Sequence, residues 1–265
     1  MKPIALRIEG VDVWAPDMPG WDVARMRLCG KVESPPPGPA RLAPSLLPAG
    51  ERRRAPESVL MAVGVAQQAC ARAAREPAQL AHVFASANGD LAVTDYLCTT
   101  LAQAPLEVSP TKFHNSVHNA PAGYWAIAAG CRESSTAISA GDATFSTGLF
   151  EAALFADSEA CPVLLVAYDI AAPGALRDVA ACDVPFAAAF VLAPDDGSGG
   201  GMARLRLTPR AQASLAPETG LLHASYPNNP AARCVPLLTA LALGRSAQLA
   251  LPLSAQLALA MEISF

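Results

Sequence analysis

The stretch that decides the fold runs from Pro110 to Ala156 and reads PTKFHNSVHNAPAGYWAIAAGCRESSTAISAGDATFSTGLFEAALFA. Within it, Thr136 to Ala140 predicts a strand, Gly141-Asp142 a tight turn, and Ala143 to Ala156 a buried helix. Such a strand-turn-helix elbow exposes the side chain at its apex beside the backbone N–H donors of the helix start. Asp142 occupies that apex. The simplest expectation is that its carboxylate caps the helix by accepting a hydrogen bond from a backbone N–H.

Outward from the elbow, strand-type and helix-type patterns alternate along the chain. This alternation predicts an α/β layered fold with a largely parallel sheet that is covered on both faces. The expected strands are Ile4 to Val13, Leu80 to Ala87, Val163 to Tyr168, Phe186 to Leu192, Met202 to Leu207 and two within Ala247 to Phe265. Besides the helix after the elbow, four more helices are expected. One begins at Pro56, and the others span Leu91 to Ala102, Asn115 to Ala129 and Cys234 to Leu243.

The composition narrows the class of protein. A chain of 265 residues with 52% hydrophobic content favours one compact core. No apolar run reaches the roughly 18 residues that span a bilayer, and the N-terminus lacks the pattern of a signal peptide, so we expect a cytoplasmic protein without an integral membrane segment. A net charge of −4 with 19 basic residues argues against nucleic acid as a partner. The one basic cluster, Arg52 to Arg54, is expected in a solvated loop, with a docking patch for an acidic partner as the alternative.

The block AAGCRESSTAISAGDATFSTGLFEAALFA resembles the active-site region of the β-ketoacyl synthases, in which a nucleophilic cysteine sits at a strand-to-helix elbow. Gly130-Cys131 corresponds to the family's preceding glycine turn, Ala137 to Ser139 to its strand, and Glu151-Ala152 to its helix end. Asp142 then stands where the cysteine should be. The upstream FHNSVHNAPAGYWAIA is similar to the family's helix before that strand, which packs at the dimer interface.

The resemblance implies the thiolase-like layered fold on which these enzymes are built. In this chain it would consist of one complete βαβαβαββ half, residues 1–195, and a reduced second half, residues 196–265, that completes the same domain. Several of the family's functional elements are missing. The cysteine is absent, as are the two histidine motifs and the catalytic lysine segment, and the surroundings of His223 do not match. An acyl-aspartyl anhydride would hydrolyse easily, so the chain alone is not expected to catalyse condensation.

Members of this family that lack the cysteine serve as chain-length factors. The resemblance therefore implies a heterodimer with an active ketosynthase subunit, a tunnel shaped for an acyl or polyene chain on an acyl carrier protein, and no cofactor or metal. The pattern is most similar to the bacterial subfamily of aryl polyene and related pigment clusters. The chain would then be a silent subunit of a 3-oxoacyl-ACP synthase in polyketide or fatty-acid-type biosynthesis.

Residues for the tunnel and the partner interface come from the apolar helix and its neighbours. For any single aromatic side chain, core packing is the simpler interpretation. The candidates are Phe113, His114, Asn115, His118, Asn119, Tyr124, Trp125, Ile127, Phe145 and Phe150.

Other readings of the same residues remain open. His114 and His118 are four apart and would share a helical face, but HNSVH lacks the glutamate of the metalloprotease pattern and no third ligand is evident. An independent hydrolase-like or lyase-like enzyme would use Asp142 with one of these histidines. A structural scaffold would bind its partner without touching the substrate.

Overall fold

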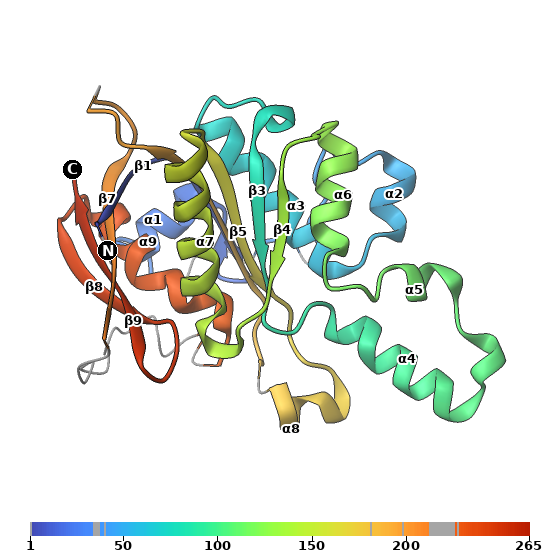
Figure 1. Ribbon diagram of the computed structural model, residues 1–265. Helices are drawn as coiled ribbons and strands as arrows, with labels where there is room; N and C mark the ends of the chain where they lie inside the picture. The colour runs from blue at the N-terminus through green and yellow to red at the C-terminus, as the bar shows by residue number, and fades with distance from the viewer. Residues whose placement is uncertain are drawn as a thin grey trace.

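A single mixed sheet runs through the molecule, in the strand order β4-β3-β5-β6-β1-β7-β9-β8, with the short β2 paired to β1 (Figure 1). The computed structural model describes residues 2–33, 38–39, 41–180, 182–197, 199–211, 226 and 228–265. The strands are β1 (Ile4–Ala15), β2 (Met18–Pro19), β3 (Ala81–Ala85), β4 (Ser135–Ile138), β5 (Val163–Asp169), β6 (Phe186–Pro194), β7 (Ala203–Ala211), β8 (Ala247–Pro252) and β9 (Leu257–Ser264).

The directions of the strands correct one expectation. Strand β3 is parallel to β4 and to β5, whereas the other pairs in the described sheet are antiparallel, so the sheet is not largely parallel. Parallel neighbours need a crossover connection, and the chain supplies one through α4, α5 and α6 between β3 and β4 and another through α7 between β4 and β5. Of the later strands, β5 and β6 and then β8 and β9 are consecutive along the chain and lie side by side in antiparallel pairs.

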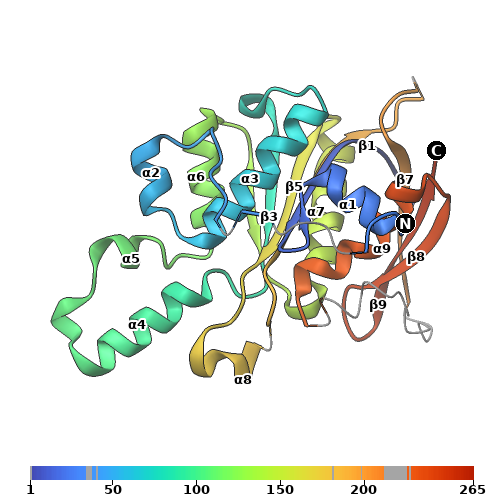
Figure 2. The same cartoon turned by 180° about the vertical axis from the view of Figure 1, so that it is seen from behind.

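Helices cover both faces of the sheet (Figures 1 and 2). Helices α3 and α6 cover one face, and α1, α7 and α9 cover the other, each pair of layers enclosing its own apolar cluster. The helices are α1 (Trp21–Leu28), α2 (Ala49–Arg54), α3 (Glu57–Arg72), α4 (Leu91–Gln103), α5 (Pro110–His114), α6 (Ala120–Ala129), α7 (Thr144–Glu159), α8 (Arg177–Ala180) and α9 (Val235–Leu243).

The segment from α4 to the turn before α6, residues 91–119, projects away from the body of the molecule (Figure 1). We call this segment the arm. The expected helix from Asn115 to Ala129 starts later than predicted: α6 begins only at Ala120, and residues 115–119 form the turn that follows α5. Pro121 lies in the first turn of α6, where the missing N–H of proline costs no helix hydrogen bond.

Helix α2 was not expected from the sequence. It contains Arg52 to Arg54, which therefore lie in a helix and not in a loop, and Arg54 pairs with Glu51 at 3.0 Å. None of the residues of α2 is buried. A helix without a buried face shows no apolar periodicity, which is why the pattern did not reveal it.

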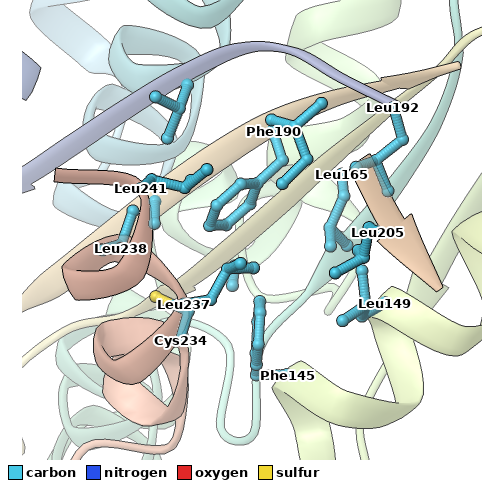
Figure 3. Packing of buried hydrophobic residues seen from close by; sticks show 14 of the residues in the cluster. Phe145, Leu149, Leu165, Phe190, Leu192, Leu205, Cys234, Leu237, Leu238 and Leu241 are labelled. Atoms are coloured by element: carbon cyan, nitrogen blue, oxygen red, sulfur yellow. The ribbon is translucent and has the colours of Figure 1, made fainter. Parts of the chain in front are cut away.

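Helix α7 is held tightly against the sheet. Phe145 and Leu149 on α7 pack among Leu165, Phe190 and the leucines of α9 (Figure 3). At Gly148 an added Cβ would lie 2.8 Å from the Cβ of Ala85 on β3, so only glycine permits this approach. The start of α7, and with it the elbow, is thereby fixed relative to the strand ends.

Strands β7, β9 and β8 continue the sheet beyond β1 and so join the C-terminal part of the chain to the first part. The division at residue 195 into two halves stays a prediction. Among the described residues, none of the helices combines the length and the hydropathy that crossing a bilayer requires.

Candidate functional site

The elbow has the geometry that the sequence predicts. Strand β4 ends at Ile138, a 3₁₀ turn spans Gly141–Ala143, and α7 begins at Thr144. The backbone φ of Gly141 is +54°, a left-handed value that glycine adopts without a Cβ clash. The hydroxyl of Thr144 accepts a hydrogen bond from the amide of Ala140 at 3.0 Å and donates to the carbonyl of Gly141 at 2.6 Å. One side chain thus ties both ends of the turn.

Asp142 lies at the apex, but it does not cap the helix. Residue Ala143 is the N-cap of α7 and supports no side-chain cap, so the expected capping role of Asp142 is wrong. The side chain of Asp142 is 77% exposed, and its Oδ2 lies 3.9 Å from the guanidinium of Arg233. Because Thr144 already closes the turn, the carboxylate faces solvent and this cation instead.

This arrangement offers little to acyl transfer. Sulfur combines easy ionisation with strong nucleophilicity, whereas an exposed carboxylate is a weak nucleophile whose acyl product hydrolyses. Among the described residues, the carboxylate of Asp142 has its ion pair with Arg233 and no bond to a histidine or cysteine. His223, the remaining histidine of the second half, lies outside the described residues.

His114 and His118 do not form a site with Asp142. His114 ends α5 on an exposed part of the arm, and Nε2 of His118 lies 2.8 Å from the carbonyl oxygen of Ser86. The two histidines do not share a helical face, because α5 ends between them. Within the described ranges, no three His, Cys, Asp or Glu side chains gather as metal ligands would.

A buried cluster lies where β3 and β5 end, at the same edge of the sheet as the elbow. We call Ser86, His118, Tyr168, Asp169 and Asn229 the strand-end cluster. Oδ1 of Asp169 accepts hydrogen bonds from the Ser86 hydroxyl at 2.8 Å and from the two following backbone amides. The Asn229 amide donates to the carbonyl of Asp169 at 3.2 Å, and Tyr168 donates to the carbonyl of His118 at 3.4 Å.

The electrostatics of the cluster follow from its burial. Burial raises the pKa of Asp169 to about 7, although the hydrogen bonds from Ser86 and the backbone amides oppose the shift. Burial also raises the pKa of Tyr168, helped by the negative charge of Asp169 beside it. Of these residues only His118 was a candidate from the sequence. The signal that would have pointed to Asp169 is its place at the end of the apolar run VLLVAYD.

Two of the candidate aromatic residues belong to the core. Trp125 is fully buried, with its ring 6.5 Å from that of Phe84, so it is not part of a partner surface. Phe145 is fully buried as well, 5.9 Å from the ring of Phe190, and it packs in the solid core on the other face of the sheet. Their assignment to an interface or tunnel is therefore corrected.

The remaining candidates lie on or beside the arm, apart from Phe150. Ile127 is 85% exposed and Phe113 is 66% exposed, while Asn115 is buried and accepts a hydrogen bond from the Tyr124 hydroxyl at 3.1 Å. A groove of about 780 Å³ lies between α2, the arm and α6. Its lining includes His114, Asn119, Tyr124 and Ile127. Phe150 on α7 is half-buried at the margin of the core.

Comparisons with solved structures find the same fold in ketosynthase complexes. A chain in the structure of the ketosynthase ApeO in complex with its chain length factor ApeC from Xenorhabdus doucetiae is 23% identical, with a TM-score of 0.73 over 97% of this chain and 99% of that one. A chain of AntDE:AntF, a type II PKS acyl-carrier protein in complex with its ketosynthase bound to the hexaketide, is 11% identical, with a TM-score of 0.76 over 100% and 99%. A chain of the ishigamide ketosynthase/chain length factor is 14% identical, with a TM-score of 0.72 over 98% and 99%.

These likenesses, at under 25% identity, establish the fold and agree with the thiolase-like architecture that the sequence resemblance implied. A comparison with curated proteins finds no match. The family model described as the β-ketoacyl synthase N-terminal domain matches residues 28–255, which is most of the chain. The chain therefore belongs to the family of the β-ketoacyl synthase N-terminal domain.

Proposed function

We propose that this chain is a non-catalytic ketosynthase-like subunit, a chain-length factor. It pairs with an active β-ketoacyl-ACP synthase as a heterodimer and shapes the tunnel that receives the growing acyl or polyene chain from an acyl carrier protein. One observation carries the proposal. In a member of the ketosynthase family, the apex of the elbow holds Asp142, which faces solvent and Arg233 in place of a thiol held ready for acylation.

The edge of the sheet supports the pairing. Strand β4 is the terminal strand of the described sheet and is hydrogen-bonded to β3 on one side only. Its other side presents backbone N–H and C=O groups that a strand from another chain can satisfy. A partner that adds a strand here would lie directly beside the elbow and α6.

The apolar surface of the arm supports it further. Leu106 is fully exposed, and Phe113 and Val117 are more than half exposed. Val117 and the exposed Ile127 on α6 both line the groove. Single exposed apolar side chains are common on monomeric proteins. Several of them gathered on one projecting segment are typical of an interaction surface. Because the arm projects from the body of the molecule (Figure 1), we expect it to contact the neighbouring subunit.

Tyr124, Phe113 and Phe150 are the aromatic candidates that remain for the tunnel, with His114, Asn119 and Ile127 along the groove. The resemblance favours an aryl polyene or related polyketide as the product and the cytoplasm as the place of synthesis. In this reading the chain has no activity of its own, and the complex acts as a 3-oxoacyl-ACP synthase.

Co-purification tests the proposal. This chain, carrying an affinity tag, is co-expressed with an active ketosynthase from the same organism, and the eluate is analysed by light scattering. We expect a one-to-one complex that elongates an acyl chain on its carrier protein, whereas neither subunit does so alone. A stable monomer that binds no ketosynthase would refute the proposal. A complex with unchanged products across Tyr124→Ala, Phe113→Ala and Phe150→Ala would favour a scaffold that does not touch the substrate.

A further inference from the structure

The chain enters the arm through residues that Asp169 holds. Oδ1 of Asp169 accepts hydrogen bonds from the Ser86 hydroxyl at 2.8 Å, the amide of Ala87 at 2.9 Å and the amide of Asn88 at 3.2 Å. The Ser86 hydroxyl in turn accepts a bond from the amide of Gly89 at 2.9 Å. Four consecutive residues before α4 therefore depend, directly or through Ser86, on one carboxyl oxygen.

The chain leaves the arm beside the same group. Nε2 of His118 donates to the carbonyl of Ser86 at 2.8 Å, since a carbonyl oxygen only accepts. The hydroxyl of Tyr168, the residue before Asp169, donates to the carbonyl of His118 at 3.4 Å. Both ends of the arm are thus fastened at the end of β5, while the segment between them projects from the body (Figure 1).

The second oxygen of Asp169 stands in contrast to the first. Oδ2 is buried and has no hydrogen-bond partner among the described residues. Burying an ionised oxygen costs far more free energy than burying a neutral hydroxyl, and the backbone amide of Ala231 offsets only part of that cost. The raised pKa of Asp169, about 7, agrees with this geometry. A proton on Oδ2 leaves Oδ1 as the acceptor for all three donors.

The titratable neighbours do not supply a compensating cation. Tyr168 adjoins Asp169 on β5. The thiol of Cys182 lies in the segment before β6; burial raises its pKa to about 12, and the negative charge of Asp169 contributes to this rise. Asp90, at the start of α4, adds a further negative charge near Tyr168. His118 faces Ser86, and Arg233, in the turn before α9, pairs with Asp142.

We propose that Asp169 is a positioning residue of the arm. In its protonated form it holds the entry of the arm directly and the exit indirectly, through Ser86, whose carbonyl His118 binds, and loss of that proton loosens both. The inference deepens the proposed function, because the arm is the surface proposed for the ketosynthase partner. It concerns the isolated chain, however, and is tested without the partner. Failure of the heterodimer would leave the test valid.

Hydrogen exchange of the backbone amides of residues 86–90 and 115–118, corrected for intrinsic rates, measures the opening of both fastenings. Linkage between a pKa of 3.8 in the open state and about 7 in the closed state predicts an opening constant that rises about fifty-fold from pH 5 to pH 7 and less than twofold from pH 7 to pH 8. The sign follows from the raised pKa in the closed state, which binds the proton more tightly. Stability from this group is full below pH 4 and is lost as pH rises through 7.

Two substitutions separate positioning from simple packing. Asp169→Asn keeps an acceptor oxygen without a titrating group, so the exchange of these amides should stay slow and lose its rise between pH 5 and pH 7. Asp169→Ala removes the acceptor, so exchange should be fast at every pH; if that variant does not fold, Asp169→Asn alone decides. Asp142→Asn, at an exposed aspartate, is the matched control and should behave as the wild type. A pH-independent opening in the wild type, or a rise retained in Asp169→Asn, would overturn the proposal.

Discussion

The elbow at Asp142 and the arm with α6 belong to neighbouring parts of one stretch of sequence, but they present opposite surfaces. The elbow, where the family carries its nucleophile, exposes a carboxylate paired with Arg233. The arm exposes apolar side chains such as Phe113, and α6 exposes Ile127, which lines the groove. In the function proposed above, the elbow therefore has no reactive role, and the arm with α6 forms the binding surface. Substitutions in the two regions should therefore affect different measurements.

The largest expected effect is on stability and separates the two faces of α6. Trp125→Ala removes a fully buried indole from the layer between α3, α6 and the sheet. Loss of buried area together with the cavity left behind should lower the free energy of unfolding by about 3–5 kcal/mol. Denaturant unfolding followed by circular dichroism measures this. A cost below about 1 kcal/mol would show that Trp125 is not part of the core.

The next effect is on binding and concerns the exposed face. Phe113→Asp combined with Ile127→Asp places two charges on the apolar surface proposed for the partner. The dissociation constant of the complex with the ketosynthase should rise about a hundredfold, because burying unpaired charges is unfavourable. The melting temperature of the isolated chain should stay unchanged, since both side chains are exposed. Surface plasmon resonance checks the affinity, and undiminished binding would place the interface elsewhere.

The smallest effect is expected at the elbow. Asp142→Ala removes an exposed carboxylate whose ion pair with Arg233 is solvated. Exposed pairs contribute little, so the free energy of unfolding should change by less than about 0.5 kcal/mol. The affinity for the ketosynthase and the rate of elongation by the complex should remain as in the wild type. A tenfold loss of rate would contradict the proposed difference between the elbow and the arm, because it would show that the elbow has a chemical role.

Much of the fold could be predicted from the sequence because its signals are local. The elbow follows from a short apolar run, a Gly-Asp break and a buried helix, and the structure places these elements within a few residues of the expected bounds. Strand direction could not be predicted, because alternation of apolar residues does not depend on which way a strand runs. The face of α6 that packs against the core could not be predicted either. The helix is apolar on all sides, so its sequence pattern did not distinguish the buried Trp125 from the exposed Ile127.

The roles of the two aspartates were harder to predict than their positions. At Asp142 the sequence predicts a cap, but the Thr144 hydroxyl bridges the turn instead, a choice that depends on side-chain geometry within three residues. Asp169 looks in the sequence like the first loop residue after a strand. Its contacts in the structure are with Ser86 and Asn229, which are far away along the chain. Its buried position therefore could not be predicted without the tertiary fold.

The central claim, that this chain binds and shapes but does not react, is tested most directly by the intact mass of each subunit after the complex is incubated with an acyl-loaded carrier protein. The acyl group should be found on the ketosynthase partner, and the mass of this chain should be unchanged, in the wild type as in Asp142→Ala. An acyl adduct on this chain that maps to Asp142 and disappears in Asp142→Ala would contradict it.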